Sequence, residues 1–545
     1  MPGLVAYMVR AVALFSLIDV VLPERHTRYR HGFALDVVGD GVSFAAAMAS
    51  AGMLLLLASA LRRRKRRAWM ISIGVLTVAV AANLYTHRHR VVVVEVLLLV
   101  VLIIARSEFA ARSERRARLA TVRVFVVMAA LSMVAGVLLT YRTAPEAALT
   151  RRISEVFFGL FGFAPELAFG VPAKAGLTQT ALTSMGALTV LFTLVAFLAP
   201  ARQRAMLSAE SEERLRCLLD RWGERDSLGY FALRRDKGVI FSPSGKAAIA
   251  YRVVGGVSLA SGDPLGDPEA WPGAIEAWTA EADSYAWVPG VVGASEEAAV
   301  AYHRAGFDAL ELGDEAVVEV AGFSLEGRPM RVVRQAVNRV NRAGYTVQIS
   351  RQHELEPDEL ALVIDASRRF RGEEAERGFS MALGRLGDPT DPQCVVARAR
   401  DGAGVLVAVL VFVPWGRKGL SLDLMRRSRD SENGTVELLI TAMIEAAPKL
   451  DVERISLNFA VFRSVFERGG KVGAGPVLRL WHKILVVASR WWQIESLYRA
   501  NAKYQPVWEP RFICFRRARE LPQIGLAALE AEAFVQRPRW RWLAR

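Results

Sequence analysis

The first 200 residues are apolar segments separated by short arginine-rich loops, and this pattern constrains the fold more than any other feature. A helix that spans a bilayer needs about 20 consecutive, mostly apolar residues. Segments that meet or approach this length occupy 4–22, 42–61, 68–85, 91–105, 122–141 and 180–199. The sequence therefore predicts an N-terminal polytopic α-helical membrane domain of about six helices over residues 1–200.

Basic residues in two loops predict the orientation of this domain. Residues 62–67 are all Arg or Lys and follow the second segment, and the loop after the fourth segment contains Arg106, Arg112, Arg115, Arg116 and Arg118. Loops rich in Arg and Lys stay in the cytoplasm. We therefore expect a multi-pass protein of the bacterial cell (inner) membrane, with the N-terminus and everything after residue 200 in the cytoplasm.

The formal net charge of +15 indicates an anionic partner, either nucleic acid or anionic lipid headgroups. A general codon preference for arginine would also produce a basic chain. No CxxC spacing occurs, and the cysteines and the histidines beyond residue 200 are scattered, at Cys217, Cys394, Cys514, His303, His353 and His482. This pattern predicts reduced thiols, no metal site and no cofactor.

Beyond residue 200, strands and helices alternate, which predicts an α/β domain. A charged helix at 205–222 comes first. Strands are expected at 240–242, 247–254 and 257–261, followed by a helix at 270–283. A second cycle of similar order is expected at 346–350 (strand), 357–370 (helix), 393–400, 405–414 and 419–425 (strands), 434–447 (helix) and 454–459 (strand).

Six short motifs follow one another in this half of the chain. They are Tyr251–Val257 with Gly262–Pro264, Gly313–Ala316, Asp423–Arg426, Asn433–Glu437, Ser456–Ala460, and Ser496–Arg499 with Lys503–Arg511. Together they resemble the catalytic domain of the phosphatidylglycerol lysyltransferase (aminoacyl-phosphatidylglycerol synthase) family, across about residues 230–517.

The resemblance implies a C-terminal α/β cytoplasmic domain of two fused acetyltransferase-like (GNAT-like) folds behind the membrane domain. The expected division is 1–200 (membrane), 201–335 (first half), 336–520 (second half, with the main site) and 521–545 (a basic, Trp-rich tail). Members of the family move an aminoacyl group from aminoacyl-tRNA to a lipid hydroxyl such as that of phosphatidylglycerol, which alters the charge of the membrane surface and the resistance to cationic peptides. The expected partners are thus aminoacyl-tRNA and an anionic membrane phospholipid. The chain departs from larger members in having fewer spans than the flippase-bearing form, and no lysyl-tRNA synthetase module is expected after residue 520.

Such a reaction needs a group that holds the substrate amine, a base near the acceptor hydroxyl and a cation near the ester. Asp423 and Arg426 lie where an expected strand becomes a loop, a usual place for ligand-binding residues. Asp423 is expected to hold the amine or act as the base, and Arg426 to bind the ester or a phosphate. Alternatively, the two side chains pair with each other on the surface.

The closing motif supplies further candidates. Glu495, Arg499 and Lys503 are four apart, so a helix at 489–504 would align them on one face, although surface ion pairs give the same spacing. The predicted catalytic set is Asp423, Arg426, Glu495 and Lys503, and the predicted substrate-binding set is Asp263, Asn433, Glu437, Asn458, Arg499 and Arg511. Lys503 and Arg511 would contact the lipid phosphate or the 3′ end of the tRNA.

The remaining candidates have simpler alternatives. Asp263 can be a turn former, Asn433 is expected to cap the helix at 434–447, and Glu437 would lie in its first turn. A tRNA-binding role is predicted for Asn338, Arg339 and Arg342 on a basic helix, which can also be an ordinary solvated face.

Two rival functions fit parts of the sequence. An acyl-CoA-dependent GNAT-type N-acyltransferase would need an Arg/Gln-x-x-Gly-x-Gly/Ala turn, and the nearest string, Arg468–Gly473, has the wrong spacing. A lipid flippase or transporter with a regulatory cytoplasmic domain is the other. The motifs name neither the amino acid nor the acceptor, which could be phosphatidylglycerol or diacylglycerol.

Overall fold

The structure is a computed structural model that describes residues 89–108, 115–143, 146–161, 172–198, 206–373, 378–461 and 500–535, with Tyr7, Leu57, Ala58, 68–74, Thr77, Val80 and Glu376. The chain divides into two compact units with the boundary near Ala201.

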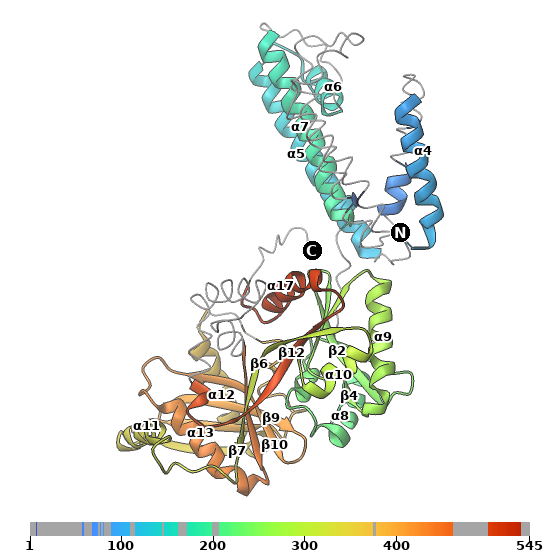
Figure 1. The fold of residues 1–545 in the computed structure, drawn as a ribbon. Helices are drawn as coiled ribbons and strands as arrows, with labels where there is room; N and C mark the ends of the chain where they lie inside the picture. Colours follow the sequence, from blue (N-terminus) through green and yellow to red (C-terminus); the bar gives the residue numbers. More distant parts are fainter. Residues whose placement is uncertain are drawn as a thin grey trace, which may run out of the picture. The chain divides into compact units, whose positions relative to one another are not determined.

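The N-terminal unit is helical in its described parts (Figure 1). Its helices are α4 (His89–Ile104), α5 (Arg115–Thr143), α6 (Leu149–Leu160) and α7 (Pro172–Leu198), with a 3-10 helix at Ala105–Glu108. Two stretches, Thr121–Arg142 and Leu177–Phe197, are long and apolar enough to cross a membrane. They match the last two predicted segments. Of the other four, 91–105 coincides with α4, and 4–22, 42–61 and 68–85 lie largely outside the described residues.

Helices α5, α6 and α7 lie side by side (Figure 1). Ser132 on α5 and Thr189 on α7 hydrogen bond through their hydroxyls at 2.9 Å. Thr183 on α7 donates to the carbonyl of Gly159 on α6 at 3.4 Å. Polar side chains inside an apolar bundle satisfy one another in this way because lipid offers them no partner.

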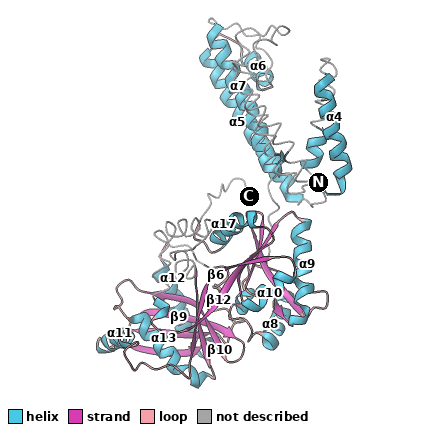
Figure 2. Ribbon diagram, viewed as in Figure 1, coloured by secondary structure: helices cyan, strands magenta, loops and turns pink. Residues whose placement is uncertain are grey.

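The C-terminal unit is built on one twelve-stranded sheet (Figure 2). Its order is β1-β2-β3-β5-β12-β6-β11-β10-β9-β8-β7, with β4 paired to β2. The strands are β1 (Gly238–Phe241), β2 (Ala247–Val254), β3 (Val257–Ser261), β4 (Leu265–Gly266), β5 (Val288–Ala294), β6 (Asp308–Glu319), β7 (Thr346–Arg351), β8 (Val395–Arg400), β9 (Leu406–Trp415), β10 (Gly419–Arg427), β11 (Arg454–Val461) and β12 (Val507–Phe515).

Helices cover this sheet. They are α8 (Ala209–Trp222), α9 (Trp271–Ser284), α10 (Glu296–Arg304), α11 (Arg331–Arg342), α12 (Pro357–Arg371), α13 (Thr435–Ala446) and α17 (Leu521–Ala531). Short 3-10 helices lie at Gly229–Leu233, Pro268–Ala270, Gln352–Glu354, Ala447–Leu450 and Ala518–Glu520.

Both faces of the sheet are buried. Every second residue of β9 from Ala408 to Phe412 packs with α11 and α13. The residues between them, from Val409 to Val413, pack with α8 and α12. Because successive side chains of a strand point to opposite faces, the uninterrupted apolar run of β9 suits a strand covered on both sides.

The strand order contains a repeat. In the first half, β1, β2 and β3 are antiparallel neighbours, and β3 runs parallel to β5. In the second half, β8, β9 and β10 are antiparallel neighbours, and β10 runs parallel to β11. This repeat supports the expected two fused units.

The two halves exchange a strand. β6 follows β5 in the sequence but pairs with β11, and β12 follows β11 but pairs with β5. β6 and β12 then pair with each other at the centre of the sheet. The expected boundary at residue 336 therefore does not separate two independent sheets, because the last strand completes the first half.

Most of the predicted elements agree with the structure, but β5, β6, β12 and α10 were not predicted. β5 and β12 contain Pro289 and Pro510, which interrupt the pattern of a strand. The region expected to be a tail begins with α17, whose Ile524, Ala527 and Ala531 are buried in the core of the first half. Residues 536–545 lie outside the described residues.

A buried charge cluster holds the exchanged strands together. Arg511 on β12 donates to Asp226 at 2.7 Å through Nη1 and to Glu315 on β6 at 2.8 Å through Nε. The same guanidinium donates to Ser227 at 2.8 Å and to the carbonyl of Gly293 on β5 at 3.3 Å. Glu315 also accepts hydrogen bonds from two hydroxyls, of which one is Ser227 and the other is Ser456 on β11. Four adjacent strands thus meet at one ion cluster.

The Arg511→Met substitution should therefore destabilise the C-terminal unit by about 3–5 kcal/mol, because it leaves two carboxylates buried without their cation. Thermal unfolding of the full chain in detergent would measure the loss. The matched control is Arg517→Met, since Arg517 is exposed and its contact with Glu520 is a surface ion pair at 3.6 Å. Equal melting temperatures for the two variants would contradict the role of the cluster.

Candidate active site

The parallel strands β10 and β11 separate partway along their length. They pair in register only from Gly419 to Ser421, opposite Arg454 to Ser456, although both strands continue beyond. The equivalent pair in the first half, β3 and β5, pairs over all of Val257–Ser261. The gap between diverging strands is therefore a property of the second half alone.

Two predicted site residues lie where the strands separate. Asp423 is the extra residue in a bulge of β10 against β9, between Leu422 and Leu424. Asn458 lies in a bulge of β11 against β6, with a positive φ of 66°. Bulges re-aim side chains and end strand pairing, and they are common beside active sites. Asn458 also donates through Nδ2 to the carbonyl of Leu422, so it bridges the two strands.

The Oδ1 atom of Asn458 is buried and has no hydrogen-bond partner among the described residues. Buried acceptors are nearly always paired, so an unpaired one at a strand gap is a candidate ligand contact.

Asp423 is a half-buried carboxylate with an altered acidity. Burial raises its pKa to about 6, while the N–H of Leu383, which donates to its Oδ1 at 2.6 Å, and the positive charge of Arg234 act in the opposite direction. A pKa close to the working pH is what general base catalysis requires.

Arg426 is anchored to α12. Its Nη1 donates to the carbonyl of Ser367 at 2.9 Å and to the hydroxyl at 3.2 Å, and its Nη2 lies 3.8 Å from Glu376. These contacts fix a cation three residues from Asp423 on the same strand.

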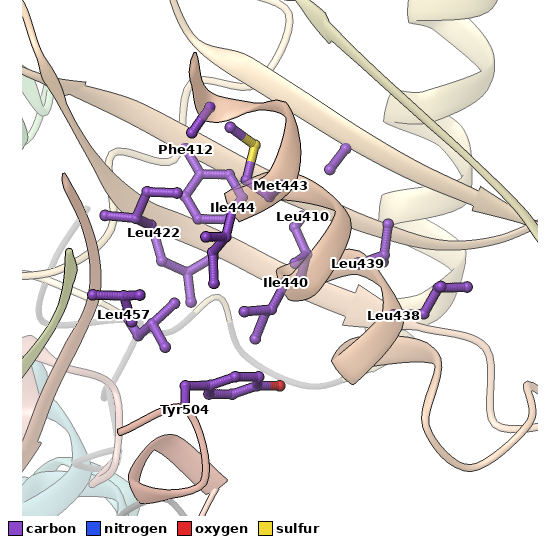
Figure 3. Packing of buried hydrophobic residues seen from close by; sticks show 14 of the residues in the cluster. Leu410, Phe412, Leu422, Leu438, Leu439, Ile440, Met443, Ile444, Leu457 and Tyr504 are labelled. Atoms are coloured by element: carbon purple, nitrogen blue, oxygen red, sulfur yellow. The ribbon is translucent and has the colours of Figure 1, made fainter. Parts of the chain in front are cut away.

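Lys503 and Glu437, predicted separately, form an ion pair of 2.5 Å. Each side chain is about one-fifth exposed, at 23% and 22%. Asn501 donates to the carbonyl of Leu457, beside Asn458, at 3.3 Å. Tyr504 is buried in the core with Leu422 and Leu457 (Figure 3). These neighbours place Lys503 beside β11 on the face of the sheet that α13 covers, whereas Leu383, the hydrogen-bond partner of Asp423, packs with α12 on the other face.

Tyr504 is a residue that the sequence analysis did not select. Its ring lies among the side chains of α13, β10 and β11 (Figure 3), and its hydroxyl is buried without a partner among the described residues. Burial, with the charge of Glu437, raises its pKa well above the usual value. Its presence in the closing motif was the only available signal.

Other predicted residues are placed elsewhere. Asp263 is buried. Its carboxylate accepts hydrogen bonds from the hydroxyl of Ser295 at 2.6 Å and from the Ser295 N–H at 2.8 Å, and Ser295 is the N-cap of α10. Burial and the neighbouring Asp226 raise the pKa of Asp263 to about 7. Arg511 lies in the buried cluster. The geometry gives both residues a structural task, and their substrate contacts stay predictions.

The predicted capping role of Asn433 is wrong. The N-cap of α13 is Gly434, which adopts a left-handed conformation with φ of 112°. Asn433 is exposed, whereas Glu437 does lie in the first turn of the helix. Glu495 and Arg499 lie outside the described residues.

The predicted tRNA contacts share one exposed face. Asn338, Arg339 and Arg342 are exposed on α11, whose opposite face buries Val333, Val337 and Val340. Among the described residues, no group of three or more His, Cys, Asp or Glu side chains is placed to hold a metal ion.

The C-terminal unit has a sheet of two repeated halves, with polar side chains where two strands of the second half separate. The N-terminal unit has two stretches apolar enough to cross a membrane. Together these features define a membrane-associated α/β protein with its candidate site in the second half. A family model described as phosphatidylglycerol lysyltransferase, C-terminal, matches residues 216–515, and one described as the transmembrane region of lysyl-tRNA synthetase matches residues 1–148. The chain belongs to the phosphatidylglycerol lysyltransferase family.

Similar proteins include the lysylphosphatidylglycerol biosynthesis bifunctional protein LysX of Rhodococcus opacus, 52% identical over 67% of this chain and 33% of the relative. The protein of the same description from Mycobacterium marinum is 47% identical over 80% of this chain and 40% of the relative. The chain thus spans a third to two-fifths of the length of these relatives.

Two solved structures share the fold. L-PGS from Bacillus licheniformis has a TM-score of 0.53 at 23% identity, covering 62% of this chain and 99% of that one. The C-terminal domain of a protein described as a lysylphosphatidylglycerol synthetase from Agrobacterium fabrum has a TM-score of 0.50 at 25% identity, covering 60% and 99%.

The Lys503–Glu437 pair can be tested by a double-mutant cycle with Lys503→Ala and Glu437→Ala. Because both side chains are partly exposed, we expect a coupling free energy of about 1 kcal/mol in thermal unfolding. The control is Lys418 with Glu453, a pair at 2.6 Å with side chains more than half exposed, which should couple less. A coupling of several kcal/mol would instead make the Lys503–Glu437 pair a structural element, with little freedom to bind substrate.

Proposed function

We propose that the protein is a multi-pass membrane aminoacyltransferase that moves an aminoacyl group from aminoacyl-tRNA to a hydroxyl of phosphatidylglycerol or a similar lipid. The observation that most supports this proposal is the carboxylate of Asp423, which has a raised pKa and lies where two parallel strands diverge. The family match supports the reaction class. The names of the relatives make lysyl-tRNA the first donor to test.

The site residues can be assigned to the steps of such a transfer. The Asp423 carboxylate removes the proton of the lipid hydroxyl as its oxygen attacks the ester carbonyl carbon of the aminoacyl-tRNA. The tetrahedral intermediate then expels the ribose oxygen of the tRNA, which takes up a proton, and the aminoacyl ester is now on the lipid. The raised pKa favours this base role over the alternative of holding the substrate amine.

Cations and amides of the second half suit the other tasks. Lys503 and Arg426 offer positive charge for the developing oxyanion or for the lipid phosphate. The unpaired Oδ1 of Asn458 offers an acceptor for the substrate ammonium group. Glu437 keeps Lys503 in place until an anionic substrate competes for it.

The expected partners, aminoacyl-tRNA and a membrane lipid, determine where the protein must be located in the cell. The exposed arginines of α11 offer phosphate contacts for tRNA without sequence readout, in keeping with the net charge of +15. Charged tRNA is cytosolic, so the C-terminal unit belongs in the cytoplasm. The basic loops after the second and fourth apolar segments favour a cytoplasmic N-terminus as well, with several spans in the bacterial inner membrane. Added lysine on the lipid would make the surface less anionic and weaken the attraction of cationic peptides.

Asp423→Asn keeps the shape of the side chain but removes its basicity. We expect a fall in transfer rate of about 30- to 1000-fold, the equivalent of roughly 2–4 kcal/mol. The assay follows labelled amino acid from tRNA into organic-extractable lipid. Asp430→Asn is the matched control, because Asp430 is exposed in the loop after the same strand.

An unchanged rate in a folded Asp423→Asn protein would show that the site is elsewhere. A wild-type protein that is inactive with every aminoacyl-tRNA but active with an acyl-CoA would establish the rival N-acyltransferase function instead.

The pKa of Asp423 also predicts the pH dependence of kcat. A base with a pKa of about 6 is ionised and active above that pH, so kcat should fall about tenfold per pH unit below it. Rates between pH 5 and 8, with the stability of the protein checked at each pH, would define this acidic limb. A limb near pH 4, the ordinary range of a carboxyl group, would rule Asp423 out as the base.

A further inference from the structure

The segment Gly378–Leu383 links Asp423 to Glu532 and Arg234, two residues that have no role in the proposed mechanism. It is buried at both ends: Phe379 and Ser380 are fully buried, and Leu383 is 3% exposed. Phe379 packs in the core of the first half with α17, whereas Leu383 packs with β9 and α12 of the second half, in a cluster that also includes α8 and β2 of the first half. The segment therefore connects the two halves.

Glu532, which follows α17, holds the first end of this segment. Its carboxylate accepts the N–H of Phe379 at 2.7 Å and the N–H of Ser380 at 2.9 Å, as well as the hydroxyl of Ser380. Its backbone carbonyl accepts the N–H of Gly378 at 3.4 Å. A carboxylate that receives several donors on one short stretch fixes that stretch with charge-assisted hydrogen bonds.

Arg234, just before β1, holds the middle of the segment. Its Nη1 donates to the carbonyl of Ala382 at 2.9 Å, and its Nε donates to Asp236 at 2.7 Å. Nearby, the fully buried Lys237 lies 4.6 Å from the centre of the Phe379 ring and donates to Ser261 at 2.6 Å. Both side chains come from the first half.

The far end of the segment reaches the candidate base. The N–H of Leu383 donates to Oδ1 of Asp423 at 2.6 Å. Asp423 lies in a strand bulge, so the strand ladder fixes its side chain less firmly, and a backbone donor from another segment can set its orientation.

We propose that Glu532 and Arg234 are positioning residues of the active site, which act on Asp423 through the segment Gly378–Leu383. The role of Asp423 as base rests on the proposed function. Neither residue touches Asp423 through a hydrogen bond of its own among those described: both hold the Leu383 N–H in place, and Arg234 adds the effect of its charge.

The charges around Asp423 predict the direction in which its pKa should change when these contacts are lost. Arg234 and the Leu383 N–H favour the ionised carboxylate, whereas Asp391 and Glu376 oppose it, as does burial. Cys394 also lies near enough to feel the charge of Asp423. Loss of either favourable contact should raise the pKa of Asp423 and shift the acidic limb to higher pH.

The test uses the full-length protein in detergent with phosphatidylglycerol and the donor tRNA on which the wild type is active. Glu532→Gln and Arg234→Gln should each lower kcat about tenfold, with both KM values within about twofold of the wild type. The acidic limb should move up by about 0.5–1 pH unit. Arg234→Lys keeps the charge and should return the limb towards its original position.

Amide hydrogen exchange provides a second readout. In Glu532→Gln, exchange should accelerate at residues 378–383, while α11, on the other side of the sheet, stays protected. Matched controls are Glu297→Gln and Arg304→Gln, exposed residues of α10, which should alter neither kcat nor the pH profile.

Folded Glu532→Gln and Arg234→Gln variants with the wild-type kcat and acidic limb would overturn the positioning role. A fall in kcat that the shift of the limb does not accompany would also overturn it, since a purely structural contact would act in that way. A wild-type protein that forms no aminoacyl lipid from any donor would refute the proposed function, which is a different result from equal activity of wild type and variants.

Discussion

The ion cluster of Arg511, Asp226 and Glu315 is the interaction on which the C-terminal unit depends. It lies where β12 and β6 cross from one half to the other, and its hydrogen bonds reach β5 and β11 as well. Buried charges are costly unless each is paired. The cluster therefore requires the exchanged arrangement: separating β12 from β6 would leave carboxylates and a guanidinium in an apolar core. Its hydrogen bonds thus tie together strands that are neighbours only in the exchanged arrangement.

This arrangement lets two similar halves do different things. In the first half, the parallel strands β3 and β5 stay hydrogen bonded over all of Val257–Ser261. This half also contributes core packing and the residues that hold the Gly378–Leu383 segment. The second half opens the equivalent pair, β10 and β11, and places Asp423 and Asn458 at the opening. Strand pairing satisfies backbone groups, so a gap between strands exposes groups that need new partners. The bulges and the side chain of Asn458 supply some of these, and a substrate can supply the rest.

The sequence predicted the elements with regular patterns and the residues with motifs. The strands 247–254 and 257–261 and the two long apolar helices agree with the structure. Asp423, Asn458, Glu437 and Lys503 were selected from motifs; Asn458 bridges to the strand of Asp423, and Glu437 pairs with Lys503, while their roles stay predictions. Asn433 failed as a cap, because the glycine after it adopts the left-handed conformation that begins α13. The strand exchange could not be predicted, since periodicity within a strand carries no information about its neighbour. Glu532 and Arg234 were missed for the same reason: their contacts join loops that are far apart in the sequence.

The exchange of strands also has a consequence for the time at which the protein can fold. β12 is synthesised about 190 residues after β6. At a translation rate of 5–20 residues per second, β5 and β6 wait about 10–40 s for the strand that lies between them. During that time two strand edges with unpaired N–H and C=O groups remain open to other chains. The sheet of the first half therefore closes only after β12 has been synthesised, although most of its strands are made much earlier.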